Sequence, residues 1–216
     1  MNSQGAAGNP YSGPKAPGSA RNPKADMKRN IVLSLPNLLT YGRILAVPAV
    51  AVCFYFEGNT ARWVALALFV LAAITDFFDG YLARAWQQQS ALGRMLDPIA
   101  DKLLVSVSLL MLAGDGTIYG WTMIAAIIIL CREILVSGLR EFLAELQVSV
   151  PVTKLAKWKT TVQLISVAFL LAGPAGDTVF AYTTQTGLVA LWLAALLTLY
   201  TGYDYFRAGI GHLITE

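Results

Sequence analysis

Charged residues are scarce in this chain of 216 residues, since aspartate, glutamate, lysine and arginine together make up only 13% of it. A soluble domain normally carries about a quarter of its residues charged. Apolar residues make up 56% of the chain, and the mean hydropathy is +0.57. Lipid is the only solvent for so much apolar surface. The composition therefore excludes an ordinary soluble domain and predicts a membrane protein.

Histidine and cysteine are nearly absent as well. The chain has one histidine, His212, and two cysteines, Cys53 and Cys131. Both cysteines lie inside apolar runs without paired spacing, which favours reduced, buried thiols over a disulfide or a zinc site. A single histidine makes neither a metal cluster nor a Ser-His pair, so we expect no histidine-based catalysis.

Long apolar runs dominate what is present. Six segments each approach the ~20 residues that a helix needs to cross ~30 Å of hydrocarbon. They predict an all-α polytopic membrane protein with six transmembrane helices at residues 38–56, 64–82, 92–113, 118–139, 153–172 and 186–206. Stretches rich in glycine, proline, asparagine or glutamine separate them and predict turns, the last of these at residues 173–176.

The N-terminal stretch has a different composition. Residues 1–25 are rich in glycine, proline and serine, which predicts a disordered tail, and they lack the pattern of a signal peptide. Residues 26–35 mix basic and apolar side chains, which predicts a short juxtamembrane amphipathic helix. Residues 26–216 are expected to form one six-helix membrane domain.

The positive charges predict an orientation. With six spans, only Arg62 of the sixteen lysines and arginines falls on the side opposite the termini. Lysine and arginine accumulate on the cytoplasmic side of membrane proteins. Both termini are therefore predicted to be cytoplasmic.

Four aspartates interrupt the apolar runs. Asp76 and Asp79 are three residues apart near the end of the second segment, and Asp97 and Asp101 are four apart at the start of the third. Each pair shares one helix face, and Gly93 lies four residues before Asp97. An ionised aspartate at the bilayer centre costs on the order of 2.5–3.5 kcal/mol, so cations must stabilise these groups. Four hard oxygen donors suit Mg²⁺ or Mn²⁺, and two such ions can support an in-line phosphoryl displacement.

Two other uses of the aspartates remain open. In the first, the aspartates form buried ion pairs with Arg84, Arg94 and Lys102. In the second, they line the pathway of a divalent-cation transporter. Gly80 and Ala83 argue against ion pairs alone, because such small side chains leave room for a ligand. Arg84 argues against the transporter, because it would repel the permeant ion.

From Asp76 to Asp101 the chain reads Asp-x2-Asp-Gly-x2-Ala-Arg-x8-Gly-x3-Asp-x3-Asp. This resembles the motif of the CDP-alcohol phosphotransferase family, with eight identities at fixed spacing. The resemblance implies a six-helix fold, usually homodimeric, with two divalent cations, Mg²⁺ or Mn²⁺, in a site that opens to the cytoplasm. It implies no nucleic acid partner. The metal ligands would be Asp76, Asp79, Asp97 and Asp101, of which Asp101 would also be the catalytic base.

The family resemblance also implies which residues bind the substrates. Thr40 and Arg43 would lie near the nucleotide phosphates. The remaining residues expected to bind the CDP-linked lipid are Asp76, Gly80, Ala83, Arg84 and Gly93.

Three further motifs are similar to the branch of this family that makes phosphatidylglycerophosphate in bacteria. They are Pro36-Asn37-Leu38-Leu39-Thr40-x2-Arg43, Arg132-Glu133 with Arg140-Glu141, and Lys157-x-Lys159-Thr160-x2-Gln163. The similarity implies CDP-diacylglycerol as donor, glycerol 3-phosphate as acceptor and a bacterial cytoplasmic (inner) membrane as location.

An acceptor with its own phosphate needs its own cations, and Arg132, Arg140, Lys157 and Lys159 are expected to supply them. Because Lys157 and Lys159 are two residues apart, a regular helix would point them in different directions. The alternative for each lysine is that it anchors a helix end at the membrane surface and does not bind the acceptor. Related acceptors such as inositol phosphate, phosphatidylglycerol or serine remain open, although the basic residues disfavour serine.

Overall fold

The computed structural model describes residues 35–86, 91–147 and 154–214, and the regular structure in these residues is entirely helical. The predicted tail and nearly all of the predicted amphipathic helix lie outside the described residues. The helices are α2 (Leu35–Cys53), α3 (Asn59–Trp86), α4 (Ala91–Gly114), α5 (Thr122–Glu145), α6 (Lys154–Asp177) and α7 (Thr183–Ile214).

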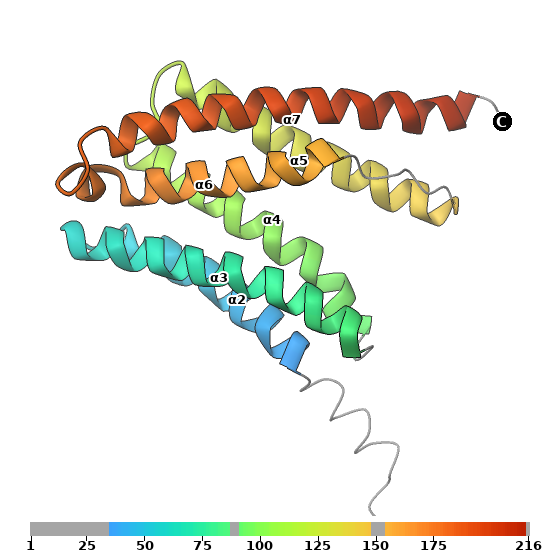
Figure 1. Cartoon of the computed structure of the whole chain (residues 1–216), viewed down its shortest axis with the longest axis horizontal. Coiled ribbons are helices and arrows are strands. Elements are labelled where there is room, and N and C mark those ends of the chain that lie inside the picture. The colour runs from blue at the N-terminus through green and yellow to red at the C-terminus, as the bar shows by residue number, and fades with distance from the viewer. Residues whose placement is uncertain (1–34, 87–90, 148–153, 215–216) are drawn as a thin grey trace, which may run out of the picture.

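Successive helices run in opposite directions along the molecule (Figure 1). Helix α2 packs against α3 and α4, while α7 packs against α5 and α6, and contacts of α6 with α3 and α4 join the two groups. Most of the buried side chains are apolar, and among the most fully covered are Phe69, Leu112, Ile129, Leu170 and Leu191. The start of α2 and the end of α7 lie toward the same end of the molecule (Figure 1).

The outer surface of the bundle is apolar. Large apolar side chains such as Leu45, Leu110, Ile134 and Val189 are exposed. In the described residues, three helical stretches are long and apolar enough to cross a membrane: Asn59–Asp76, Thr122–Glu145 and Thr183–Arg207. The prediction of an all-helical chain with membrane-spanning segments is confirmed to this extent.

Two predicted boundaries differ from the structure. The predicted fifth span ends at residue 172, and α6 does break at Gly173, where φ is 44° and ψ is −130°, but residues 174–176 are helical rather than a turn and α6 continues to Asp177. The helical part after the kink begins with Pro174, whose fixed φ suits the first turn of a helix. Helix α5 starts at Thr122 rather than at residue 118, because positive φ angles at Gly116 and Gly120 keep the chain out of a helix there.

Arg62, the one basic residue predicted on the side opposite the termini, connects several segments at the kinked end of the bundle. Its guanidinium pairs with Asp115 and donates hydrogen bonds to Thr117 Oγ1 (3.0 Å) and the Leu170 carbonyl (3.3 Å). It also lies over the ring of Phe54, 5.2 Å from the centroid. Arg62 thus links α3 with the α4–α5 turn and with α6.

Candidate functional site

The first predicted acid, Asp76 on α3, pairs with a cation from α2. Arg43 Nη1 lies 2.6 Å from Asp76 Oδ1, and the Arg43 side chain is fully buried while that of Asp76 is 42% exposed. Arg43 is therefore not an arginine that reaches out to the membrane surface. It is a buried charge that faces one of the four predicted metal ligands.

Thr40 lies one turn before Arg43 on α2 and contacts a second acid. Its hydroxyl donates a hydrogen bond to the carboxylate of Asp97 on α4. Thr40 is buried, whereas Asp97 is partly exposed. One face of α2 therefore holds acids from two other helices, Asp76 and Asp97.

The acids of α3 and α4 face a common region. Asp76 lies within electrostatic range of Asp97. Asp101, one turn after Asp97 on the same helix, lies within electrostatic range of Asp76, Arg43 and Glu133. Asp76 thus lies within electrostatic range of both Asp97 and Asp101.

A metal centre at these acids is consistent with their chemistry. Carboxylate oxygens are the donors that Mg²⁺ and Mn²⁺ prefer. Within the described side chains, no group of three acidic, histidine or cysteine residues forms a complete metal site. The side chain of Asp79, the fourth predicted ligand, lies outside the described residues, and the helical spacing of α3 places its backbone one turn after Asp76. The metals therefore stay a prediction.

The predicted alternative, ion pairing of the aspartates with nearby basic residues, stays open at Lys102, which lies within electrostatic range of Asp101. Its ammonium donates a hydrogen bond to the Pro98 carbonyl of its own helix, at 3.0 Å. The side chains of Arg84 and Arg94, like those of Gly80 and Ala83, lie outside the described residues. Gly93 is buried at the start of α4.

A second polar cluster joins α5, α6 and α7 around Glu133. Its Oε1 accepts hydrogen bonds from Arg132 Nη1 (3.3 Å) and from the ammonium of Lys159. Arg132 Nη2 donates to Thr201 Oγ1 on α7 at 3.1 Å. Two of the four predicted acceptor-binding residues, Arg132 and Lys159, therefore converge on one carboxylate.

Of the other two predicted acceptor-binding residues, the structure describes the side chain of Arg140. Arg140 is exposed, lies over the ring of Tyr205 at 5.7 Å from the centroid, and is within electrostatic range of Arg132. The side chain of Lys157 lies outside the described residues. The backbone of α7 approaches Arg132 closely at Gly202, where a Cβ atom would lie 3.1 Å from Arg132 Cγ.

A small cavity lies between Asp101 and this cluster. Its volume is about 20 Å³, and its lining includes Asp101, Glu133, Lys159 and Gln163. Gln163 is 4% exposed, and its Oε1 accepts no hydrogen bond within the described part of the chain. Gln163 belongs to the motif that contains Lys157 and Lys159, but the family resemblance assigns it no role. Its position four residues after Lys159, on the same face of α6, is the signal that could have revealed one.

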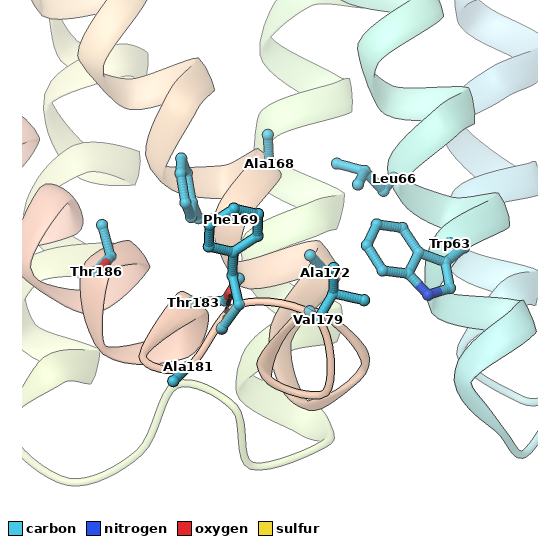
Figure 2. Close-up of a pocket in the computed structure, with 11 residues that line it drawn as sticks. Trp63, Leu66, Ala168, Phe169, Ala172, Val179, Ala181, Thr183 and Thr186 are labelled. Atoms are coloured by element: carbon cyan, nitrogen blue, oxygen red, sulfur yellow. Dashed lines mark hydrogen bonds between the residues drawn. The ribbon is translucent and has the colours of Figure 1, made fainter.

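A larger cavity of about 410 Å³ lies elsewhere (Figure 2). Trp63 and Leu66 of α3 face Phe169 and Ala172 of α6 across it, and its lining is almost wholly apolar. Asp76 lies ten residues beyond Leu66 on α3, or ~15 Å at 1.5 Å per residue. The cavity is therefore remote from the acids, and its apolar wall suits lipid chains better than a charged substrate.

Comparisons with known proteins agree with the resemblance found in the motifs. Residues 33–200 match the sequence model of the CDP-alcohol phosphatidyltransferase family. Three similar proteins each carry the name CDP-diacylglycerol–glycerol-3-phosphate 3-phosphatidyltransferase. The protein of Cereibacter sphaeroides is 44% identical over 85% of this chain and 98% of its own length. The Rickettsia bellii protein is 49% identical over 81% and 94%, and that of Salmonella choleraesuis is 37% identical over 85% and 98%.

The match covers α2 to α6 and α7 as far as residue 200, and so includes the acids, Glu133 with Arg132 and Lys159, and the small cavity. The chain belongs to the CDP-alcohol phosphatidyltransferase family.

Proposed function

We propose that this protein transfers the phosphatidyl group of CDP-diacylglycerol to glycerol 3-phosphate, giving phosphatidylglycerophosphate and cytidine monophosphate. The names of the relatives support this choice of donor and acceptor. The observation that carries the proposal is the cavity lined by both Asp101 and Lys159. It lies between a set of acids suited to metal-bound diphosphate and a basic cluster suited to a second phosphate.

The donor side of the site consists of Asp76, Asp79, Asp97 and Asp101, which would hold two divalent cations, Mg²⁺ or Mn²⁺. When bound, these ions neutralise the charge of the diphosphate. Arg43 holds Asp76 in place and Thr40 holds Asp97 in place. This positioning role is additional to their predicted contact with the nucleotide phosphates.

The remaining donor-binding residues come from the family motif. Gly80, Ala83 and Gly93 leave room for the nucleotide. The planar guanidinium of Arg84 matches a phosphate group better than an ammonium would.

The chemical step is a displacement at phosphorus. The hydroxyl of glycerol 3-phosphate attacks the phosphorus on the lipid side, and its proton passes to the carboxylate of Asp101. The bond to the bridging oxygen breaks, and cytidine monophosphate leaves with the electron pair. Catalysis of this kind depends mainly on positioning and charge neutralisation.

The acceptor phosphate is assigned to the cations around Glu133. Arg132 Nε is buried and donates to no group in the described residues, so one N–H remains for a phosphate oxygen. Lys159 lies beside it through their shared partner Glu133. Arg140 adds positive charge on one side of this cluster. Lys157 is the fourth proposed acceptor-binding residue.

The proposal includes the setting of the enzyme. All six helices cross a bacterial cytoplasmic (inner) membrane, and both termini and the active site face the cytoplasm. The protein forms a homodimer. The apolar exterior and the distribution of lysine and arginine support this arrangement.

One assay tests the proposal. Purified protein in detergent micelles receives CDP-diacylglycerol, Mg²⁺ or Mn²⁺, and one acceptor from a panel, and the release of cytidine monophosphate is followed. We expect turnover with glycerol 3-phosphate. Turnover only with inositol phosphate, phosphatidylglycerol or serine would replace the acceptor, and cation flux without nucleotide turnover would favour a transporter.

A further inference from the structure

Gln163 on α6 has a buried polar atom with no partner in the part of the chain that the structure describes. Its side chain is among the buried polar groups, and its Oε1 accepts no hydrogen bond within the described residues. Buried side-chain oxygens are hydrogen-bonded in the large majority of cases. A carbonyl oxygen accepts hydrogen bonds only, so the missing partner is a donor such as a hydroxyl group.

The surroundings of Gln163 indicate where that donor comes from. Gln163 shares the cavity of about 20 Å³ with Asp101, Glu133 and Lys159. A space of this size holds about one water-sized group, so a hydroxyl fits and a phosphate does not. The phosphate and the reacting hydroxyl of an acceptor would therefore lie outside the cavity, beside Lys159 and Asp101, with one further hydroxyl reaching into the cavity toward Gln163.

We propose that Gln163 accepts a hydrogen bond from the second, non-reacting hydroxyl of the acceptor, and so selects a phosphorylated polyol. This inference rests on the proposed function, in which one hydroxyl reacts beside Asp101 and the phosphate binds Lys159. In glycerol 3-phosphate the hydroxyl on the middle carbon lies between those two groups. Lys159 and Gln163 are four residues apart on one helix face and therefore contact neighbouring parts of the same acceptor.

Selection by a buried carbonyl oxygen has a measurable consequence. An acceptor without the middle hydroxyl leaves this oxygen unpaired in the complex, and sites built to bind a hydroxyl reject such analogues strongly. The matching analogue is 3-hydroxypropyl phosphate, which keeps the reacting hydroxyl, the chain length and the phosphate. We expect the wild-type protein to prefer glycerol 3-phosphate by about 10- to 100-fold in kcat/KM.

The experiment removes the proposed hydrogen bond in two ways, by changing the acceptor and by substituting Gln163. The ratio of kcat/KM for the two acceptors is measured for the wild-type protein, Gln163→Leu, Gln163→Met and Thr198→Val. Both Gln163 variants should lose activity mainly with glycerol 3-phosphate, which brings the ratio within about threefold of one. Thr198 is the matched control, because its Oγ1 is also buried without a partner in the described residues but does not line the cavity. Its variant should keep the wild-type ratio.

The possible failures are distinguishable. A wild-type protein that uses both acceptors equally well overturns the inference without any variant and leaves the proposed function intact. Equal losses with both acceptors in the Gln163 variants overturn it too, because they indicate a structural role. If the wild-type protein shows no turnover with glycerol 3-phosphate but accepts another alcohol, the proposed function and the inference both fail.

Discussion

The buried guanidinium of Arg43 lies 2.6 Å from the carboxylate of Asp76, which joins α2 to the end of α3. One turn earlier on α2, Thr40 donates to Asp97 of α4. Helix α2 therefore fixes acids from two helices at once. Because metal coordination and phosphoryl transfer require groups fixed to a fraction of an ångström, we consider this arrangement the structural basis of the site.

Removing Arg43 tests its pairing with Asp76. In Arg43→Met the Asp76 carboxylate loses its partner, and we expect a loss of about 1–3 kcal/mol in the free energy of unfolding, because Asp76 is 42% exposed and water screens it in part. Transfer activity should fall at least about tenfold. The double variant Arg43→Met/Asp76→Asn should recover part of the stability and none of the activity. Thermal unfolding in detergent and release of cytidine monophosphate measure the two effects. A double variant that is as unstable as the sum of its single variants contradicts the pairing.

Variants of Asp97 and Thr40 compare the loss of a predicted metal ligand with the loss of a group that only positions that ligand. Asp97→Asn removes a charged oxygen donor and should abolish transfer while the protein still inserts in the membrane. Thr40→Val removes only the hydrogen bond to Asp97, and we expect about a tenfold loss of kcat. Substantial turnover by Asp97→Asn would remove Asp97 from the predicted metal site.

Arg132 tests the acceptor side. Arg132→Ala removes a cation from the proposed phosphate site, so the KM for glycerol 3-phosphate should rise by about tenfold or more while the KM for CDP-diacylglycerol changes little. Arg207→Ala is the matched control, because Arg207 is an exposed arginine on α7 outside the cluster. An equal rise in KM for both substrates would move Arg132 out of the acceptor site.

Gly173 tests the kink in α6. Its φ of 44° disfavours any side chain, and an added Cβ would lie 2.7 Å from Arg62 Nη1. The kink also explains why Arg62 bonds to Leu170: in a helix that carbonyl would accept from residue 174, which is proline and has no N–H. Gly173→Ala should therefore lower the free energy of unfolding by about 1–3 kcal/mol.

The control for the kink is Gly138→Ala within α5, where an added Cβ meets no atom of the described residues within 4 Å. Alanine favours a helix over glycine by roughly 1 kcal/mol, so this variant should be neutral or more stable. Thermal unfolding in detergent compares the two. Equal stability of Gly173→Ala and the wild-type protein would contradict the close approach of Arg62.

The part of the site that follows from helix geometry could be predicted from the sequence. Asp97 and Asp101 share a face because residues four apart do so in any helix. The partners of these acids could not be predicted, because Thr40 and Asp97 are 57 residues apart and meet only through the packing of α2 on α4. Lys159 and Glu133 are likewise brought together by packing, at a separation of 26 residues.

The fold likewise has a part that could be predicted from the sequence and a part that could not. Apolar runs predict the helices, because lipid requires about twenty apolar residues whatever the packing. The kink at Gly173 could not be predicted, since glycine followed by proline equally favours a turn. The outcome there depends on Arg62, which lies more than a hundred residues away and satisfies the carbonyl that the kink leaves free.

The most direct test of the account measures divalent metal at the acids. Mn²⁺ binding to purified protein with cytidine diphosphate is followed by electron paramagnetic resonance, in the wild-type protein, Asp97→Asn and Thr198→Val. We predict two Mn²⁺ ions per chain in the wild-type protein and in Thr198→Val, with loss of at least one in Asp97→Asn. Wild-type protein that turns over its substrates in the presence of excess chelator, and binds no Mn²⁺, would contradict the account.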